Sequence, residues 1–178
     1  RRRITCSGAV QGVGFRPFAY VLAQELGLTG YVINSAQGAA IEVQGTARQL
    51  DEFESRLMSD LPSPGQVQRK ESMQIPIREE LEFSIQNSTG EGPKSALVLP
   101  DLAPCPLCLA EIHEPSDRRY RYPFTNCTHC GPRYSIIRGL PYDRPNTSMA
   151  RFPLCPKCQM EYDDPTDRRF HAQPTACP

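Results

Sequence analysis

The chain has 178 residues, and its 20 basic and 20 acidic side chains give a formal net charge of zero. A neutral chain lacks the excess of Lys and Arg that attracts nucleic acids or anionic membranes, which argues against both as partners. No apolar run approaches the roughly 20 residues of a membrane-spanning helix, and no segment resembles a signal peptide. We therefore expect a cytoplasmic protein with no membrane partner.

Proline and cysteine divide the chain into two unlike halves. Four of the 18 prolines lie in residues 1–90, whereas seven of the eight cysteines follow residue 100. The second half is therefore expected to be rich in loops and held by something other than a large core. A polar stretch rich in Gly, Ser and Pro near residues 87–94 predicts the boundary, with a domain over 1–90, a linker over 91–100 and a second region over 101–178. Residues 96–99 are expected to form a short apolar strand.

Hydrophobic periodicity predicts strands and helices in alternation through the first half. Strands are expected over residues 4–10, 28–33, 40–43, 67–77 and 81–85, the last with Leu81, Phe83 and Ile85 on one face. The order is βαββαβ with a possible extra strand, which predicts an α+β, ferredoxin-like fold with two helices on one face of an antiparallel sheet. Cys6 is expected to be a small buried hydrophobe rather than a reactive thiol.

The two helices carry recognisable start and stop signals. The first begins near Phe15 and is expected to end at Gly27, a residue suited to the position after a helix. The second has Thr46 as its N-cap. Its apolar stripe is expected to comprise Leu50, Phe53, Leu57 and Met58. Residues 34–38 are expected to form the hairpin loop between the second and third strands.

A glycine turn lies between the first strand and the first helix, in residues 9–18 (AVQGVGFRPF). Gly12 and Gly14 allow positive φ, and the N–H groups of such a turn converge on one point and bind anions. Arg16 is a cation at the positive end of the helix dipole, which is reasonable if an anion lies between them. The alternative is a plain glycine turn with a solvated arginine. The candidate phosphate-binding residues are Gln11, Gly12, Val13, Gly14, Phe15 and Arg16.

Residues 10–16 (VQGVGFR), followed by residues 30–34 (GYVIN) and Gly38, resemble the acylphosphatase signature. The resemblance covers about residues 1–90 and implies that Arg16 grips a phosphoryl group while Asn34 orients the attacking water. From the residues alone, Asn34 has the alternative of serving turn geometry. The chemistry suits these residue types, because positioning and charge stabilisation carry most of a phosphoryl transfer and a carboxylate or carbamate leaves without a strong acid.

A cysteine repeat with an offset of 50 residues occupies the second half. Each unit has two cysteines separated by two residues, then 18 residues, then a second pair, of which the second unit shows only the first member. Such knuckles predict structural zinc sites with four thiolate ligands. The candidate ligands are Cys105, Cys108, Cys127 and Cys130 in the first finger (residues 105–130) and Cys155, Cys158 and Cys177 in the second finger (residues 155–178).

Several alternatives remain open for the fingers. Disulfides and iron are less favoured ligand chemistries, and the knuckles pair either sequentially, as the repeat favours, or in a nested order. His171 or a ligand from outside the chain is a candidate to complete the second site, while His129 is expected to pack or be solvated. Two arginine pairs, at residues 118–119 and 168–169, suit either nucleic-acid contact or salt-bridged surface turns with adjacent acidic residues, and the turns are favoured.

The two halves together resemble the N-terminal part of the HypF family, the carbamoyltransferases of nickel–iron hydrogenase maturation. Motifs in residues 119–133, 140–145 and 167–174 extend the resemblance over essentially the whole chain. It implies that the chain hydrolyses carbamoyl phosphate and that, in the full-length protein, the carbamate feeds ATP-dependent carbamoylation of HypE for cyanide ligand synthesis. The adenylation and transfer domains are not among these residues, so we expect hydrolysis without transfer. The alternative is a zinc-dependent adaptor that binds protein or nucleic acid and has an inactive acylphosphatase fold.

Overall fold

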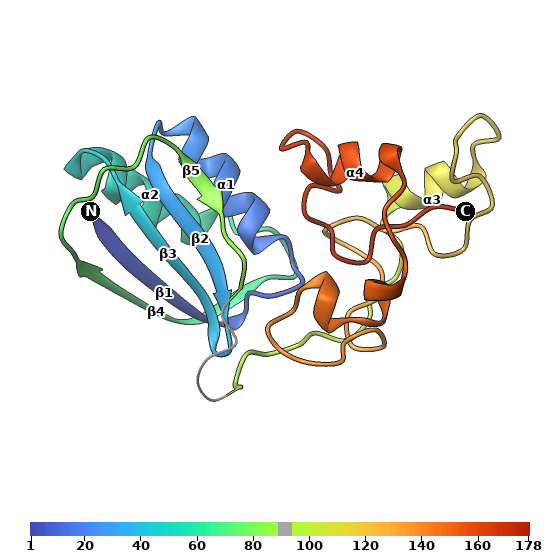
Figure 1. Ribbon diagram of the computed structural model, residues 1–178, viewed down its shortest axis with the longest axis horizontal. Helices are drawn as coiled ribbons and strands as arrows, with labels where there is room; N and C mark the ends of the chain where they lie inside the picture. The colour runs from blue at the N-terminus through green and yellow to red at the C-terminus, as the bar shows by residue number, and fades with distance from the viewer. Residues whose placement is uncertain (89–93) are drawn as a thin grey trace.

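The computed structural model describes residues 1–88 and 94–178, which form a sheet-and-helix half and a loop-rich half lying side by side (Figure 1). Residues 91–93 of the expected linker lie outside the described residues. Residues 94–100 form no strand, contrary to the expectation for residues 96–99. The N–H groups of Ser95 and Ala96 instead donate to the Ala36 carbonyl at 2.9 and 3.0 Å, which docks this segment onto the turn of a hairpin. The domain limits stay predictions.

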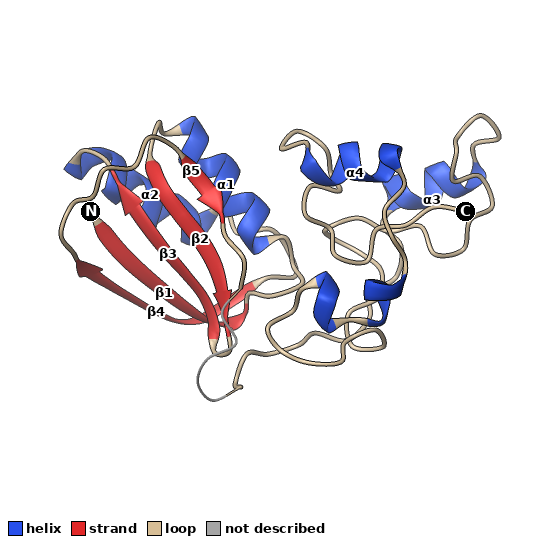
Figure 2. Ribbon diagram, in the orientation of Figure 1, coloured by secondary structure: helices blue, strands red, loops and turns tan. Residues whose placement is uncertain are grey.

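The first half is the expected α+β fold with one added edge strand. Its elements are β1 (Arg2–Ala9), α1 (Phe15–Glu25), β2 (Thr29–Ser35), β3 (Gly38–Gln44), α2 (Ala47–Ser59), β4 (Gln66–Gln74) and β5 (Phe83–Ile85). The strand order is β4-β1-β3-β2-β5, in which β5 pairs with β2 in parallel and the other neighbours are antiparallel. Both helices cover the same face of the sheet (Figure 2).

The helix boundaries follow the local signals. Gly14 is the N-cap of α1 with φ 77°, and Gly27, with φ 62°, follows its C-cap. Thr46 caps α2 in a reciprocal arrangement with Gln49, which satisfies two N–H groups that the first turn would otherwise leave unpaired. The start of α1 therefore lies directly after the glycine turn, as expected.

The hydrophobic core lies between the sheet and the two helices, and Cys6 is part of it. The predicted apolar stripe of α2 was wrong in one residue, Met58. Its side chain is 40% exposed because it lies one residue beyond the buried Leu57 and turns away from the sheet. The prediction of the last strand, over residues 81–85, was also too long. The strand begins at Phe83, which is buried, whereas Leu81 is 98% exposed because no strand continues that far to hold it against the helices.

The second half has short helices joined by loops. They are α3 (Pro106–His113), η1 (Arg144–Asn146), η2 (Ser148–Arg151) and α4 (Pro156–Asp163). Each α-helix starts immediately after a cysteine, with proline as its first residue, where the missing N–H has no consequence. The small cluster of buried hydrophobic residues here consists of cysteines, so the expectation of a half without a large core of its own is confirmed.

The two arginine pairs join the fingers to each other. Arg119 of the first finger pairs with Glu161 of the second, and Arg169 of the second pairs with Glu111 of the first. Both arginines are buried. Burial alone would raise the pKa of Glu161, but hydrogen bonds from Arg119 and Arg118 lower it to about 2. The expected surface turns paired with adjacent acids were therefore wrong, because the partners come from the other repeat.

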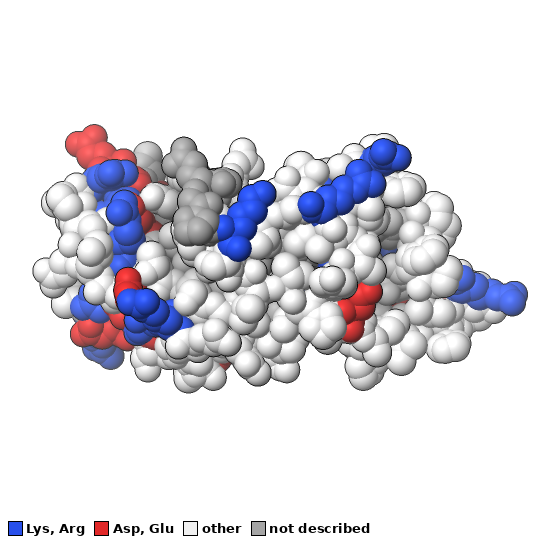
Figure 3. All heavy atoms as spheres, turned by 90° about the horizontal axis from the view of Figure 1, so that it is seen from below, with Lys and Arg blue, Asp and Glu red and all other residues white. Residues whose placement is uncertain are grey.

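The face in Figure 3 carries residues of both signs gathered near the end formed by the sheet, and separate charged side chains over the rest of that face. Among the described residues, no helix has the length and apolar character needed to cross a membrane.

Candidate functional site

The glycine turn between β1 and α1 leaves a set of backbone donors free. Gly12 and Gly14 have φ of 69° and 77°, the positive values that the sequence predicts. In the described part of the chain, the N–H groups of residues 11–15 donate to no backbone carbonyl, and the hydrogen bonds of α1 begin with the Phe18 N–H donating to Gly14. These donors lie at the positive end of α1 and suit an anion.

Arg16 stands at this end of the helix and is 8% exposed. Its Nη2 lies 2.5 Å from Oδ1 of Asp143, a residue of the loop-rich half. Nη1 donates to the Ser88 hydroxyl at 3.3 Å, and Nη2 also approaches the Tyr142 carbonyl at 3.5 Å. The guanidinium is therefore oriented by contacts from both halves of the molecule.

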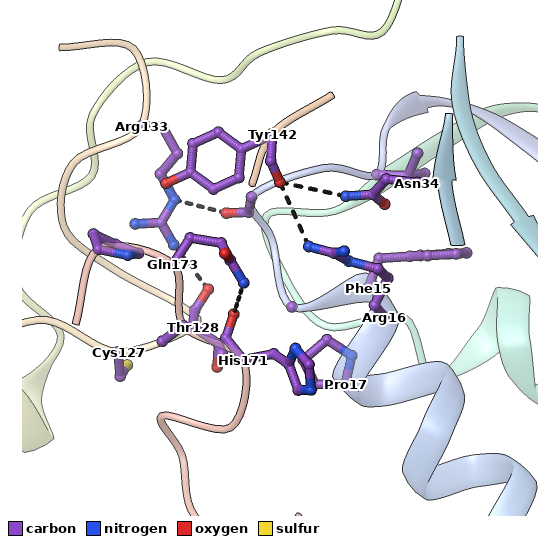
Figure 4. A pocket seen from close by; sticks show the side chains of 15 residues that line it. Phe15, Arg16, Pro17, Asn34, Cys127, Thr128, Arg133, Tyr142, His171 and Gln173 are labelled. Atoms are coloured by element: carbon purple, nitrogen blue, oxygen red, sulfur yellow. Dashed lines mark hydrogen bonds between the residues drawn. The ribbon is translucent and has the colours of Figure 1, made fainter. Parts of the chain in front are cut away.

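Asn34 lies beside Arg16 (Figure 4). It is 1% exposed. When its side-chain oxygen faces the guanidinium, it accepts from Arg16 Nε and Nη2 at 3.2 and 3.3 Å. In the opposite amide orientation, Nδ2 donates to the Tyr142 carbonyl at 3.4 Å. Asn34 belongs to β2 rather than to a hairpin loop, since only residues 36 and 37 separate β2 from β3, and the sheet therefore fixes its backbone.

The side chain of Gln11 forms hydrogen bonds to the hairpin and to the loop-rich half. Its Nε2 donates to the carbonyls of Ser35 and Gly38, both at 2.7 Å, which ties the turn to the β2–β3 hairpin. Its Oε1 accepts from the Tyr142 N–H at 2.7 Å. Because these contacts occupy the carboxamide, Gln11 has only its backbone to offer a phosphate.

The loop-rich half closes over the turn. A cavity of about 30 Å³, room for about one water molecule, is lined by residues from both halves. Arg133 Nε donates to the Gly12 carbonyl at 2.7 Å, and an added Cβ on Gly12 would meet Arg133 and Tyr142 at 3.2 and 3.4 Å. Sequence reasoning missed this wall. The signal was present in the motifs of residues 119–133, 140–145 and 167–174, which contain the lining residues Thr128, Arg133, Tyr142, His171 and Gln173, and also Asp143, the ion-pair partner of Arg16.

His171 belongs to this wall and not to a cysteine cluster. It packs against Tyr162 and Phe170, with ring centroids 4.9 and 4.7 Å away, and lines the cavity that contains Arg16. Burial, followed by the charge of Arg16, lowers the pKa of His171 to about 4. The candidate role of His171 as a metal ligand is therefore wrong, and the imidazole is neutral at pH 7.

The four cysteines of the first finger gather as the repeat predicts. The sulfurs of Cys105, Cys108, Cys127 and Cys130 all lie within 4.8 Å of one another. The Cys105–Cys127 and Cys127–Cys130 pairs are 3.8 Å apart, close to the ~3.8 Å edge of a tetrahedron around Zn²⁺ with ~2.3 Å bonds. A disulfide requires about 2 Å, so this alternative is wrong. The favoured sequential pairing is confirmed, and the donor set fits zinc.

The second finger gathers three sulfurs, those of Cys155, Cys158 and Cys177, within the same limit. Cys155 and Cys177 are 3.5 Å apart. Within residues 1–88 and 94–178, no histidine or carboxylate joins this cluster or that of the first finger. The two clusters therefore have four and three ligands, and zinc is the metal we propose for both.

Known proteins match both halves of the chain. The acylphosphatase family model matches residues 2–85, and the HypF finger model matches residues 105–137 and 154–178. Carbamoyltransferase HypF of Synechocystis sp. is 54% identical over 149 residues, which cover 84% of this chain and 19% of that protein. The chain belongs to the HypF family. A crystal structure of full-length HypF in a phosphate- and nucleotide-bound form superimposes with a TM-score of 0.95 at 47% identity, covering 99% of this chain and 23% of that one.

The first half of the chain also has relatives of its own length. An acylphosphatase of Ligilactobacillus salivarius is 32% identical over 84 residues, which cover 47% of this chain and 93% of that protein. The chain spans about a fifth of the length of its HypF relatives. The chain thus combines an acylphosphatase region with HypF fingers.

Proposed function

We propose that this chain hydrolyses carbamoyl phosphate with Arg16 and Asn34 as its catalytic pair. The observation that carries the proposal is the placement of the Asn34 amide 3.2 Å from Arg16 Nε, next to a turn with free N–H groups at the start of α1. Donors and a fixed guanidinium around one point stabilise the charge of a phosphoryl group in the transition state. Phosphate in the crystals of the full-length relative agrees with an anion in this family of proteins.

The proposed reaction divides the work between these groups. The turn N–H groups and Arg16 hold the phosphoryl oxygens, and Asn34 orients a water molecule toward phosphorus. The water oxygen bonds to phosphorus while the bond from phosphorus to the carbamoyl oxygen breaks, and its electron pair leaves with the carbamate. The protons of the water pass to phosphate and solvent. The leaving group is a weak base, so no protonated side chain has to assist it.

In the full-length protein, we propose that the carbamate goes on to ATP-dependent adenylation and that the carbamoyl group then passes to HypE for cyanide ligand synthesis. The first cysteine cluster has a structural role, because four thiolates leave a zinc ion no open position for substrate, and we propose the same role for the second. Thiolate metal sites suit a reducing compartment, so we propose a cytoplasmic location.

Phosphate release from carbamoyl phosphate by the zinc-loaded chain tests this function. Arg16→Ala should lower kcat at least a hundredfold and weaken binding of inorganic phosphate, whereas Asn34→Ala should lower kcat with phosphate binding kept. Arg48→Ala, on the exposed face of α2, is the matched control and should behave like the wild type. Wild-type turnover no faster than that of Arg16→Ala would contradict the proposal and favour the inactive adaptor.

A further inference from the structure

One segment of the loop-rich half reaches the catalytic pair directly. Residues 142–144, which we call the strap, lie between the two fingers in the chain and pass over Arg16 and Asn34. The Asp143 carboxylate meets Arg16 Nη2 at 2.5 Å, and the two side chains are 18% and 9% exposed. This ion pair joins residues 127 positions apart, so the loop-rich half supplies the counter-charge of a catalytic side chain.

The strap is fixed on both sides. Toward the sheet, the Tyr142 N–H donates to Gln11 Oε1 at 2.7 Å, and Tyr142 is 3% exposed. Toward the second finger, the Arg144 N–H donates to Gln173 Oε1 at 2.8 Å, and Arg144 Nη1 donates to the Gln173 and Thr175 carbonyls at 2.7 and 2.9 Å. Because its neighbours are held in this way, Asp143 presents its carboxylate from a rigid backbone.

Arg16 needs such a partner. It is a nearly buried cation at the positive end of a helix, where both desolvation and the helix dipole disfavour its charge. A carboxylate on one side offsets this cost and fixes the rotamer before substrate arrives. The contact engages one nitrogen, Nη2, whereas Nε faces Asn34 and Nη1 has a long bond to Ser88. A guanidinium has five N–H donors, and these contacts, together with that of Nη2 to the Tyr142 carbonyl, leave one N–H of Nη1 for a phosphoryl group.

We propose that Asp143 is a positioning residue of the acylphosphatase site, which holds the Arg16 guanidinium in its productive orientation and makes the fingers part of the active site. The inference rests on the proposed function. It assigns to the motif of residues 140–145 a role in hydrolysis. A fixed guanidinium contributes to kcat more than to binding, because it needs no reorganisation in the transition state.

Steady-state kinetics with carbamoyl phosphate on the zinc-loaded chain separate positioning from other roles. Asp143→Asn keeps the shape of the side chain and removes its charge. It should lower kcat ten- to a hundredfold while KM and the Kd for inorganic phosphate change less than about threefold, and Asp143→Glu should recover part of the loss. Asp60→Asn, which removes a carboxylate at the exposed end of α2, is the charge-matched control.

Two outcomes would overturn the proposal. An unchanged or higher kcat in Asp143→Asn, with tighter phosphate binding, would make Asp143 a competitor of the substrate. A parallel loss of kcat and phosphate affinity that Asp143→Glu does not repair would make it a support of the fold only.

A second measurement tests the positioning role of Asp143 even if the wild type proves inactive. An inactive wild type would refute the proposed function and would leave the positioning role to this measurement. NMR exchange of the Arg16 Nε proton with solvent reports the order of the guanidinium without any turnover. Asp143→Asn should speed this exchange at least tenfold, and Asp143→Glu should speed it less. Equal exchange rates in the wild type and Asp143→Asn would refute positioning.

Discussion

Arg168 of the second finger donates from Nη1 to the Cys108 sulfur of the first finger at 2.9 Å. The relationship is reciprocal. Arg118 of the first finger donates to the Cys158 sulfur of the second at 3.3 and 3.4 Å, so each finger supplies N–H donors to the cysteine cluster of the other. Donors to a thiolate offset its negative charge and orient it, as partners outside the ligand shell do in metal sites generally.

Loss of an arginine should therefore weaken the metal site of the opposite finger. Arg168→Ala should lower the zinc affinity of the first site ten- to a hundredfold, the usual range for such partners, whereas Arg118→Ala should affect the second site. Competition with a chromophoric chelator measures both. Arg138→Ala serves as the control, because Arg138 is exposed and does not contact either cysteine cluster. An effect of Arg168→Ala confined to its own finger would contradict the crossed arrangement.

The two clusters should also release metal at different chelator concentrations. The first site offers four thiolates to an ion and the second offers three, so the second site should empty first in a titration with EDTA, and elemental analysis should identify zinc. Cys177→Ser should remove the weaker step and leave the stronger one. Release of both ions in one step, with Cys177→Ser abolishing both, would show that the sites are not independent.

His171 should make the protein sensitive to mild acid. The folded-state pKa of about 4 lies below the unfolded value near 6.5, so the unfolded chain binds the proton more readily between these values. The free energy of unfolding should then fall as pH drops from 7 to 4, by up to about 3 kcal/mol. Urea unfolding at several pH values measures the slope.

A matched variant isolates that contribution. His171→Asn tolerates the positive φ of 53° at this position and cannot titrate, so its stability should fall less over the same interval. The lowered pKa of Glu161 acts below about pH 4.5 and is common to both proteins. Identical slopes above pH 4.5 would remove His171 as the cause.

The two glycines of the turn should differ in their tolerance of a side chain. Both have positive φ, so Gly14→Ala should cost about 1 kcal/mol of stability from backbone strain alone, its Cβ meeting Thr128 at an ordinary 3.4 Å. Gly12→Ala adds a tight 3.2 Å contact to Arg133 and should lose more stability and more turnover. Urea unfolding and phosphate release compare the variants. Equal losses of stability and turnover in the two variants would indicate that Arg133 moves aside at no cost.

Local patterns in the amino-acid sequence determine much of this protein. Glycines at 12 and 14 specify the turn, the capping pair of Thr46 and Gln49 fixes the start of α2, and paired cysteines specify the clusters. Each of these features depends on neighbours within a few residues, so the sequence shows it directly. At Leu81, two residues before the three-residue strand β5, the prediction failed because burial there depends on which segment lies alongside.

What lies opposite each functional side chain was decided by the tertiary structure. Asp143 forms an ion pair with Arg16, 127 positions away in the sequence. Arg119 pairs with Glu161 of the other repeat rather than with the acidic residues next to it in the sequence. The packing of the backbone determines which charged side chains lie next to each other. Periodicity along the sequence does not show which residues far apart in the chain come into contact. The sequence therefore indicated the candidate groups for the proposed chemistry, and only the packing of the two halves decided what holds them in place.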